Sequence, residues 1–186
     1  MNLSYKKTYD LIEKYQPLYQ KELIFKEKIL ELISTCDDCF LRSCRVGHFT
    51  ASAFLLNKEL SHVLLMHHTK LDKWMQLGGH CDGDADILGV AIKEAQEESG
   101  IKEIKPLNSE IFDIDIHLIP PSNKDEAHYH FDIRFLLHAY NDDKVCKNHE
   151  SKELRWIKKD STELPSKSDS VTRMFEKIQK AKKLEV

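Results

Sequence analysis

Two segments in the second half of the chain alternate between hydrophobic and polar residues. In residues 111–118 and again in residues 128–138, an apolar side chain occupies every second position. Such alternation is typical of a β-strand, because successive side chains of a strand point to opposite faces of its sheet. Residues 119–127 between them form a loop of a length that permits an antiparallel hairpin. The polar positions of the two predicted strands are Asp113, Asp115, His117, His128, His130, Asp132 and Arg134.

The first third of the chain has a helical pattern. Apolar residues of the segment 18–33 recur at helical spacing with charged residues between them, and Pro17 is expected to start this helix. A second helix is predicted over residues 86–99, where Gly100 is placed to end it as a left-handed cap. A closing amphipathic helix is predicted from Ser168 onward.

Further strands are predicted between these helices, over residues 48–57, 62–68, 104–107 and 153–158. Strands and helices interleave, which indicates one α/β domain. A chain of 186 residues suits a single domain with a full hydrophobic core, and no internal repeat or linker divides it. We therefore expect an N-terminal helical extension over residues 1–44, packed on a domain that spans residues 45–186.

The composition excludes several classes of protein. Apolar residues make up 41% and charged residues 32%, as in a soluble globular protein, and the net charge of −3 gives no general attraction to nucleic acid or anionic membrane. The N-terminus has no continuous apolar stretch typical of a secretion signal, and no apolar run approaches the roughly 20 residues that cross a bilayer. We expect a cytoplasmic protein that acts on a small molecule. The oligomeric state stays open, with a homodimer as one option.

The five cysteines form an uneven, odd-numbered set, for which reduced thiols are the simplest explanation. Cys36, Cys39 and Cys44, with His48 as a fourth ligand, offer an alternative interpretation as a zinc site. Structural zinc sites usually combine two close pairs of ligands, and this segment has one clear pair.

The segment "KEAQEESG", residues 93–100, places Glu94, Glu97 and Glu98 within five positions. On a helical wheel these three carboxylates fall within an arc of about 100°, and the apolar residues of 87–99 cluster on a different side. Neighbouring carboxylates repel each other in water, but a hard divalent cation reverses the sign because it binds oxygen ligands. The segment is therefore either a solvated helix face or a cation site.

Residues 78–101, "GGHCDGDADILGVAIKEAQEESGI", resemble the signature of the Nudix hydrolases, the MutT-like superfamily. The positions that match are Gly79, Glu94, Glu97, Glu98, Gly100 and Ile101. The sequence departs from the signature where Ala85 replaces an early Glu, Lys93 replaces Arg and Ala95 replaces a larger aliphatic residue. The "W-x-x-P" that often precedes this signature is altered to Trp74–Leu77.

The resemblance covers residues 45–180, and it implies an α/β/α sandwich with a mixed sheet. It also implies Mg²⁺- or Mn²⁺-dependent hydrolysis of a phosphoanhydride bond in a nucleoside diphosphate linked to another moiety. By position, Glu97 and Glu98 are the firmest metal ligands, together with the Gly79 carbonyl. Glu94 is the candidate for a further ligand or for the general base.

Other polar residues are weaker candidates for the same site. Glu150 and Glu153 are candidates for a base from a later loop, with ordinary surface charge as the alternative. Arg134 is a candidate for binding phosphate, and the alternative is that it pairs with Asp115 or Asp132. His80 and Lys93 complete the set of residues considered as substrate-binding groups or bases. A second metal site on His128, His130 and Asp132 is a further hypothesis, because alternation places these side chains on one face.

The departures at Ala85 and Lys93 keep an alternative function open. Both positions belong to the charge pairing inside the family signature, and lysine cannot reproduce the fork geometry of arginine. A non-catalytic or weakly active Nudix-fold protein that binds a nucleotide or a partner is therefore the rival interpretation. An isomerase on the same fold is another rival, although no feature of the sequence favours it.

Overall fold

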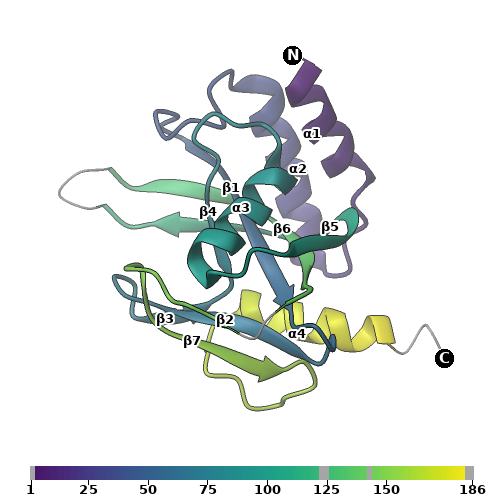
Figure 1. Ribbon diagram of the computed structural model, residues 1–186. Coiled ribbons are helices and arrows are strands. Elements are labelled where there is room, and N and C mark those ends of the chain that lie inside the picture. Colours follow the sequence, from purple (N-terminus) through teal and green to yellow (C-terminus); the bar gives the residue numbers. More distant parts are fainter. Residues whose placement is uncertain (1–2, 122–125, 142–143, 183–186) are drawn as a thin grey trace. The chain divides into compact units, whose positions relative to one another are not determined.

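The computed structural model describes residues 3–121, 126–141 and 144–182 (Figure 1). The helices are α1 (Leu3–Lys14), α2 (Gln20–Thr35), α3 (Ile87–Ser99) and α4 (Asp169–Lys182). The strands are β1 (Gly47–Leu56), β2 (His62–His68), β3 (Lys73–Met75), β4 (Leu77–His80), β5 (Ile104–Ile119), β6 (His128–Ala139) and β7 (Ser151–Lys158). They pair in the order β3-β2-β1-β6-β5, with β4 on β1 and β7 on β2. The predicted α/β class, a mixed sheet with N-terminal helices, is confirmed.

Most predicted elements lie within one or two residues of their observed bounds. Two predicted strands, at 104–107 and 111–118, are one continuous strand, β5. The short strands β3 and β4 were not predicted, because three or four residues do not establish a period and β4 contains Gly78 and Gly79. The predicted loop at 119–127 lies partly outside the described residues.

The expectation that Pro17 starts the helix predicted over residues 18–33 is wrong. Tyr19 is the N-cap of α2, and the Glu22 side chain accepts hydrogen bonds from the amides of Leu18 and Tyr19, both at 3.0 Å. The helix begins where Glu22 satisfies these amides, as in a capping box. No helix among the described residues is long and apolar enough to cross a membrane.

The chain divides into two compact units, and α3, β1, β4, β5 and β6 contribute residues to both. The first unit comprises residues 1–52, 79–91 and 109–135. In it α1 contacts α2, as Figure 1 shows, and an aromatic core forms around Phe40. The Phe40 ring stacks on Phe49 at a centroid distance of 4.7 Å and contacts Tyr5 at 4.7 Å. The division into residues 1–44 and 45–186 stays a prediction.

The second unit comprises residues 53–78, 92–108 and 136–186. Strand β2 pairs antiparallel with β7 from His62↔Lys158 to His68↔Ser151, with an irregularity in register between His67 and His68. The Phe54 ring packs edge-on against Phe175 of α4 at 5.2 Å. These contacts bury the central side chains of β2, from Val63 to Met66, so this unit has an apolar core of its own.

Gly100 ends α3 in the left-handed conformation, as predicted, with φ at +74°. Its amide donates to the Gln96 carbonyl at 2.9 Å, and a Cβ built on Gly100 would lie 3.0 Å from the Cβ of Cys146. The Cys146 amide in turn donates to the Ser99 carbonyl at 2.7 Å. The sharp end of the acidic helix therefore depends both on a backbone that suits glycine and on close packing of residue 146.

Gly100→Ala should destabilise the protein by about 1–2 kcal/mol, because a side chain in the left-handed region is strained. This loss corresponds to a fall in Tm of about 2–8 °C for a chain of this size. Thermal unfolding followed by circular dichroism measures it, with Lys102→Ala at an exposed neighbouring position as the control. A Tm for Gly100→Ala equal to that of the control would contradict the role assigned to the cap.

Candidate functional site

The acidic helix α3 separates apolar and acidic side chains. Its apolar face buries Ile87, Val90, Ala91 and Ala95. Of the three predicted metal ligands, Glu94 is half-buried, Glu97 is exposed and Glu98 is only 2% exposed. The three carboxylates therefore lie on one helix in three different environments, and Glu98 is the unusual one.

Glu98 is a buried carboxylate held by a backbone amide. Its Oε2 accepts a hydrogen bond of 2.8 Å from the amide of Gly78 in β4. The pKa of Glu98 is raised to about 8, chiefly by burial. The negative charges of Glu94, Glu150 and Glu97 act in the same direction, and the Gly78 hydrogen bond opposes them. A divalent cation among these carboxylates would relieve the repulsion, so the chemistry of the donors fits a hard metal ion.

Glu97 points toward a different partner. The Lys93 Nζ lies 3.8 Å from the Glu97 Oε1, and both side chains are more than half exposed. In the described part of the chain, the carboxylate oxygens of Glu94, Glu97 and Glu98 do not all lie within 4.8 Å of one another. Two effects keep these carboxylates apart. Their like charges repel each other, and each has a different partner, because Lys93 attracts Glu97 and the Gly78 amide binds Glu98.

The two candidate bases, Glu150 and Glu153, have different surroundings. Glu150 immediately precedes β7, and its charge raises the pKa of Glu98. Burial lowers the pKa of His68, an effect that Glu150 opposes. Glu153, by contrast, accepts hydrogen bonds from the Arg155 Nε and Nη2 at 2.8 and 2.6 Å. Glu150 therefore belongs to the electrostatic environment of the acidic helix, and Glu153 forms an exposed ion pair within β7.

The loop before α3 is held by the N-terminal helices and the segment that follows them. The Thr8 hydroxyl donates to the carbonyl of Ala85 at 2.7 Å, where both residues are buried. The amide of Gly83 donates to the Phe40 carbonyl at 2.8 Å, and Arg42 forms a two-pronged ion pair with Asp82. Ala85 occupies the position where the signature has a Glu, so contacts from the first 44 residues brace this loop where an acidic side chain is lacking.

Arg134 lies in a buried cluster of charges. Its side chain is 2% exposed, and its guanidinium contacts Asp132 at 2.7 Å, Asp113 at 3.0 Å and Asp115 at 3.4 Å. Burial alone would lower the pKa of Arg134, and the three aspartates more than reverse that effect. This arrangement agrees with the alternative expectation, in which Arg134 pairs with Asp115 or Asp132.

His80 belongs to a group of histidines. Its Nε2 lies 3.2 Å from the Nε2 of His130, and burial lowers the pKa of His80 to about 4 and that of His130 to about 2. The positive charge of Arg42 acts on the pKa of His80 in the same direction. Both imidazoles are therefore neutral near pH 7.

The hypothesis of a metal site on His128, His130 and Asp132 names one wrong residue. The Asp132 carboxylate accepts hydrogen bonds from Thr50 at 2.9 Å and Ser52 at 2.7 Å, in addition to its contact with Arg134. The third residue that lies with His128 and His130 is His48. This grouping could not be predicted from the spacing of residues, because His48 belongs to a strand 80 residues before His128.

The cysteines are all present as thiols. The Sγ atoms of Cys36 and Cys44 lie 3.2 Å apart, and Asp38 is near them. Cys39 is fully buried, which raises its pKa to about 12. Among the described residues, the ligand atoms of Cys36, Asp38 and Cys44 all lie within 4.8 Å of one another. The alternative zinc set of Cys36, Cys39, Cys44 and His48 does not form such a group.

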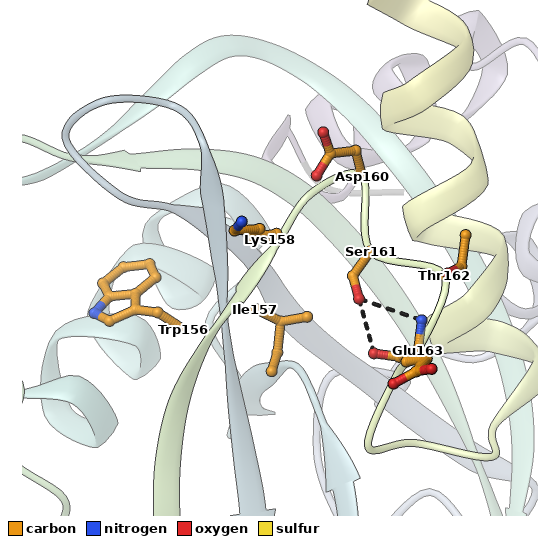
Figure 2. Close-up of a pocket in the computed structure, with 7 residues that line it drawn as sticks. All are labelled: Trp156, Ile157, Lys158, Asp160, Ser161, Thr162 and Glu163. Carbon is orange, nitrogen blue, oxygen red and sulfur yellow. Dashed lines mark hydrogen bonds between the residues drawn. The ribbon is translucent and has the colours of Figure 1, made fainter.

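A surface pocket lies at the end of β7 (Figure 2). It is lined by Trp156, Ile157, Lys158, Asp160, Ser161, Thr162 and Glu163. The Ser161 hydroxyl donates to the Glu163 carbonyl at 2.8 Å and accepts from the Glu163 amide at 3.2 Å, which closes a turn at its rim. None of the residues predicted for the site lines this pocket.

The model of one protein family, described as the NUDIX domain, matches residues 47–176. A search of curated proteins found no match. Among solved structures, a NUDIX-family hydrolase from Clostridium perfringens is 25% identical, with a TM-score of 0.55 over 72% of this chain and 97% of that one.

Two more distant structures share the fold. An Ap4A hydrolase from C. elegans is 17% identical, with a TM-score of 0.57 over 72% of this chain and 96% of its own. A UDP-X diphosphatase is 13% identical, with a TM-score of 0.53 over 95% of this chain and 93% of its own. Because the second alignment covers nearly the whole chain, its similarity extends into the N-terminal helices.

Glu98→Gln should change the dependence of stability on pH in the presence of EDTA. The pKa of Glu98 rises from 4.5 to about 8 on folding, so the folded wild type binds one more proton than the unfolded chain between these values. Wild-type stability should therefore fall as pH rises through this window, and this contribution should be absent from the neutral variant. Urea unfolding at pH 5, 7 and 9 measures the difference, with Glu97→Gln as an exposed control. Parallel curves for wild type and Glu98→Gln would contradict the assignment.

Arg134→Met should lower the free energy of unfolding by about 3–5 kcal/mol, because three buried aspartates lose their cation. Arg155→Met removes an exposed ion pair and should change it by at most about 1 kcal/mol. Denaturant unfolding of both variants makes the comparison. A stable Arg134→Met protein that had lost affinity for a nucleotide substrate would instead support the phosphate-binding role.

Proposed function

The chain belongs to the NUDIX domain family, and from this premise we propose that it hydrolyses a phosphoanhydride bond in a nucleoside diphosphate linked to another moiety. Membership of the family confirms the expected class of enzyme, a Nudix-type pyrophosphohydrolase. The substrate, the metal ion and the roles of individual residues are our proposals. They rest on the residues around the acidic helix.

The observation that supports this function most directly is the environment of Glu98. A carboxylate that is 2% exposed, hydrogen-bonded to a backbone amide and surrounded by three other acidic groups is costly in a protein without a cation. A face that served only for solubility would leave its carboxylates in water. The burial of Glu98 therefore favours a functional site over a solvated helix face.

Glu94, Glu97 and Glu98 would hold Mg²⁺ or Mn²⁺, and the Gly79 carbonyl is a further ligand implied by the family resemblance. When bound, the ion neutralises charge on the phosphate oxygens and lowers the pKa of a water molecule. Glu98 is the residue whose position is fixed before any substrate arrives, because Gly78 orients its carboxylate. Lys93, 3.8 Å from Glu97, partly balances the charge of that exposed carboxylate.

We assign the general base to Glu150 rather than Glu153. The Glu150 charge acts on Glu98, whereas Arg155 occupies the Glu153 carboxylate with two hydrogen bonds. A base must accept a proton from the attacking water, so a carboxylate already neutralised by a guanidinium is poorly suited to that role. Glu150 is exposed, and the His149 Nε2 lies 3.8 Å from its Oε1, a longer contact than the 2.6 Å ion pair between Arg155 and Glu153.

Two further points bear on the substrate and on where the protein works. The likeness to a UDP-X diphosphatase over 95% of the chain supports a substrate in which a nucleoside diphosphate carries a second group. The five free thiols suit the reducing conditions of the cytoplasm, which we propose as the location of the protein.

Hydrolysis should be found when the purified protein is incubated with Mg²⁺ or Mn²⁺ and a panel of nucleotide sugars, dinucleoside polyphosphates and nucleoside triphosphates. Glu97→Gln, Glu98→Gln and Glu150→Gln should each lower kcat/KM by at least about 100-fold, since they remove a ligand or the base. Release of mononucleotide or phosphate, followed by chromatography, is the measurement. Glu27→Gln on the exposed face of α2 is the matched control.

Two outcomes would overturn parts of this proposal. Full turnover in both Glu97→Gln and Glu98→Gln would exclude the acidic helix as the catalytic site. Ligand binding without metal and without product across the whole panel would favour the alternative of a Nudix-fold binding protein.

A further inference from the structure

Five histidines gather on one face of the strands of the first unit. His48 lies on β1, His80 at the end of β4, His117 on β5, and His128 and His130 on β6. The ring centroid of His48 is 5.0 Å from that of His128, 5.0 Å from that of His130 and 5.1 Å from that of His80. Segments far apart in the sequence therefore bring imidazoles together around His48, which is 2% exposed.

The spacing of the ring nitrogens matches that of ligands around one small ion. Each of His48, His128 and His130 presents a nitrogen, and these three atoms all lie within 4.8 Å of one another. Zn–N bonds of about 2.0–2.1 Å in a tetrahedron place ligand nitrogens about 3.4 Å apart. The Nε2 atoms of His80 and His130 are 3.2 Å apart, close to this separation.

The hydrogen bond of His128 also favours coordination. Its Nδ1 lies 2.8 Å from the backbone carbonyl of Glu126. A carbonyl oxygen only accepts, so Nδ1 carries the hydrogen of this bond and Nε2 is the nitrogen left to contact an ion. Metal-binding histidines are commonly fixed in this way, with one nitrogen bonded to a carbonyl and the other to the ion.

Acidic groups continue from this cluster along the same face. The Nδ1 of His117 is 3.3 Å from the Asp115 carboxylate, and the His117 ring lies 5.4 Å from that of His130. Asp115 also contacts Arg134, which it shares with Asp113 and Asp132. Three aspartates and one arginine carry a net charge of −2, which favours a divalent cation at the histidine end of this face.

A hydrogen-bonded stack of imidazoles without a metal is the competing explanation. It accounts for the pair His80 and His130, because one ring can donate to the other. It does not by itself account for the nitrogens of His48, His128 and His130, which all lie within 4.8 Å of one another. Imidazole nitrogen suits zinc, copper and nickel, whereas Mg²⁺ prefers oxygen, so the chemistry of this cluster differs from that of the acidic helix.

We propose that His48, His128 and His130 bind a late first-row divalent cation such as Zn²⁺, with His80 as the nearest candidate for a fourth ligand. This site is separate from the carboxylates Glu94, Glu97 and Glu98 and does not depend on the proposed hydrolysis. It consists of side chains from β1 and β6, held by strand pairing rather than by a flexible loop.

The test is zinc binding by the full-length protein after removal of metal with EDTA. Titration with Zn²⁺ against a chromophoric chelator should give one site that Mg²⁺ does not compete for. Co²⁺ at the same site should give the visible absorption bands of a nitrogen-ligated ion. His128→Ala and His130→Ala should each weaken Zn²⁺ binding at least about tenfold, and His80→Ala should weaken it less if three histidines suffice.

The controls separate this site from the other groups that bind metals. Cys36→Ser/Cys44→Ser and Glu98→Gln should retain the Zn²⁺ affinity of the wild type, and so should His149→Ala, whose side chain is 90% exposed. Circular dichroism checks that each variant is folded. If His48→Ala unfolds, the less buried His128→Ala decides the question.

Three results would overturn the proposal. They are the absence of a stoichiometric Zn²⁺ site, wild-type affinity in both His128→Ala and His130→Ala, and loss of the site in the cysteine double variant. Retention of one site in all controls, with loss in the histidine variants, would support it.

Discussion

The hydrogen bond from the Gly78 amide to Glu98 is the interaction on which the acidic helix depends. It joins β4 to α3 and places one carboxylate out of water, where neighbouring acids act on it strongly. A charge in such a place is tolerated because a backbone dipole is aimed at it, and it becomes favourable when a cation is near. Because this bond fixes the position of Glu98, the charges of Glu94, Glu97 and Glu150 act on its carboxylate and raise its pKa.

The sequence was sufficient to predict much of this arrangement. Periodicity located α3, and Gly100 was assigned as its cap because glycine tolerates a positive φ. The spacing of Glu94, Glu97 and Glu98 placed three carboxylates on one helix. It did not indicate that Glu98 would be buried and Glu97 exposed, because that difference comes from the strand and the lysine that lie beside each of them.

Alternation in β5 and β6 identified strands but did not indicate which of their polar side chains would be buried. Polar residues at every second position usually indicate a solvated side, yet Asp113, Asp132 and Arg134 are buried and Leu118 is 55% exposed. Charged groups can be buried when they pair with each other, and pairing across strands is not visible in a pattern of single residues. The contact between Thr8 and Ala85, 77 residues apart, was hidden for the same reason.

The buried group of Arg134 and three aspartates limits how this protein can diverge during evolution. Each of the four side chains depends on the others for its charge to be tolerated, so substitutions there have effects that do not add. A lineage that loses the arginine is expected to lose aspartates as well, or to replace the whole set with apolar residues of similar volume. Relatives should therefore fall into discrete classes at positions 113, 115, 132 and 134, with few intermediates between them.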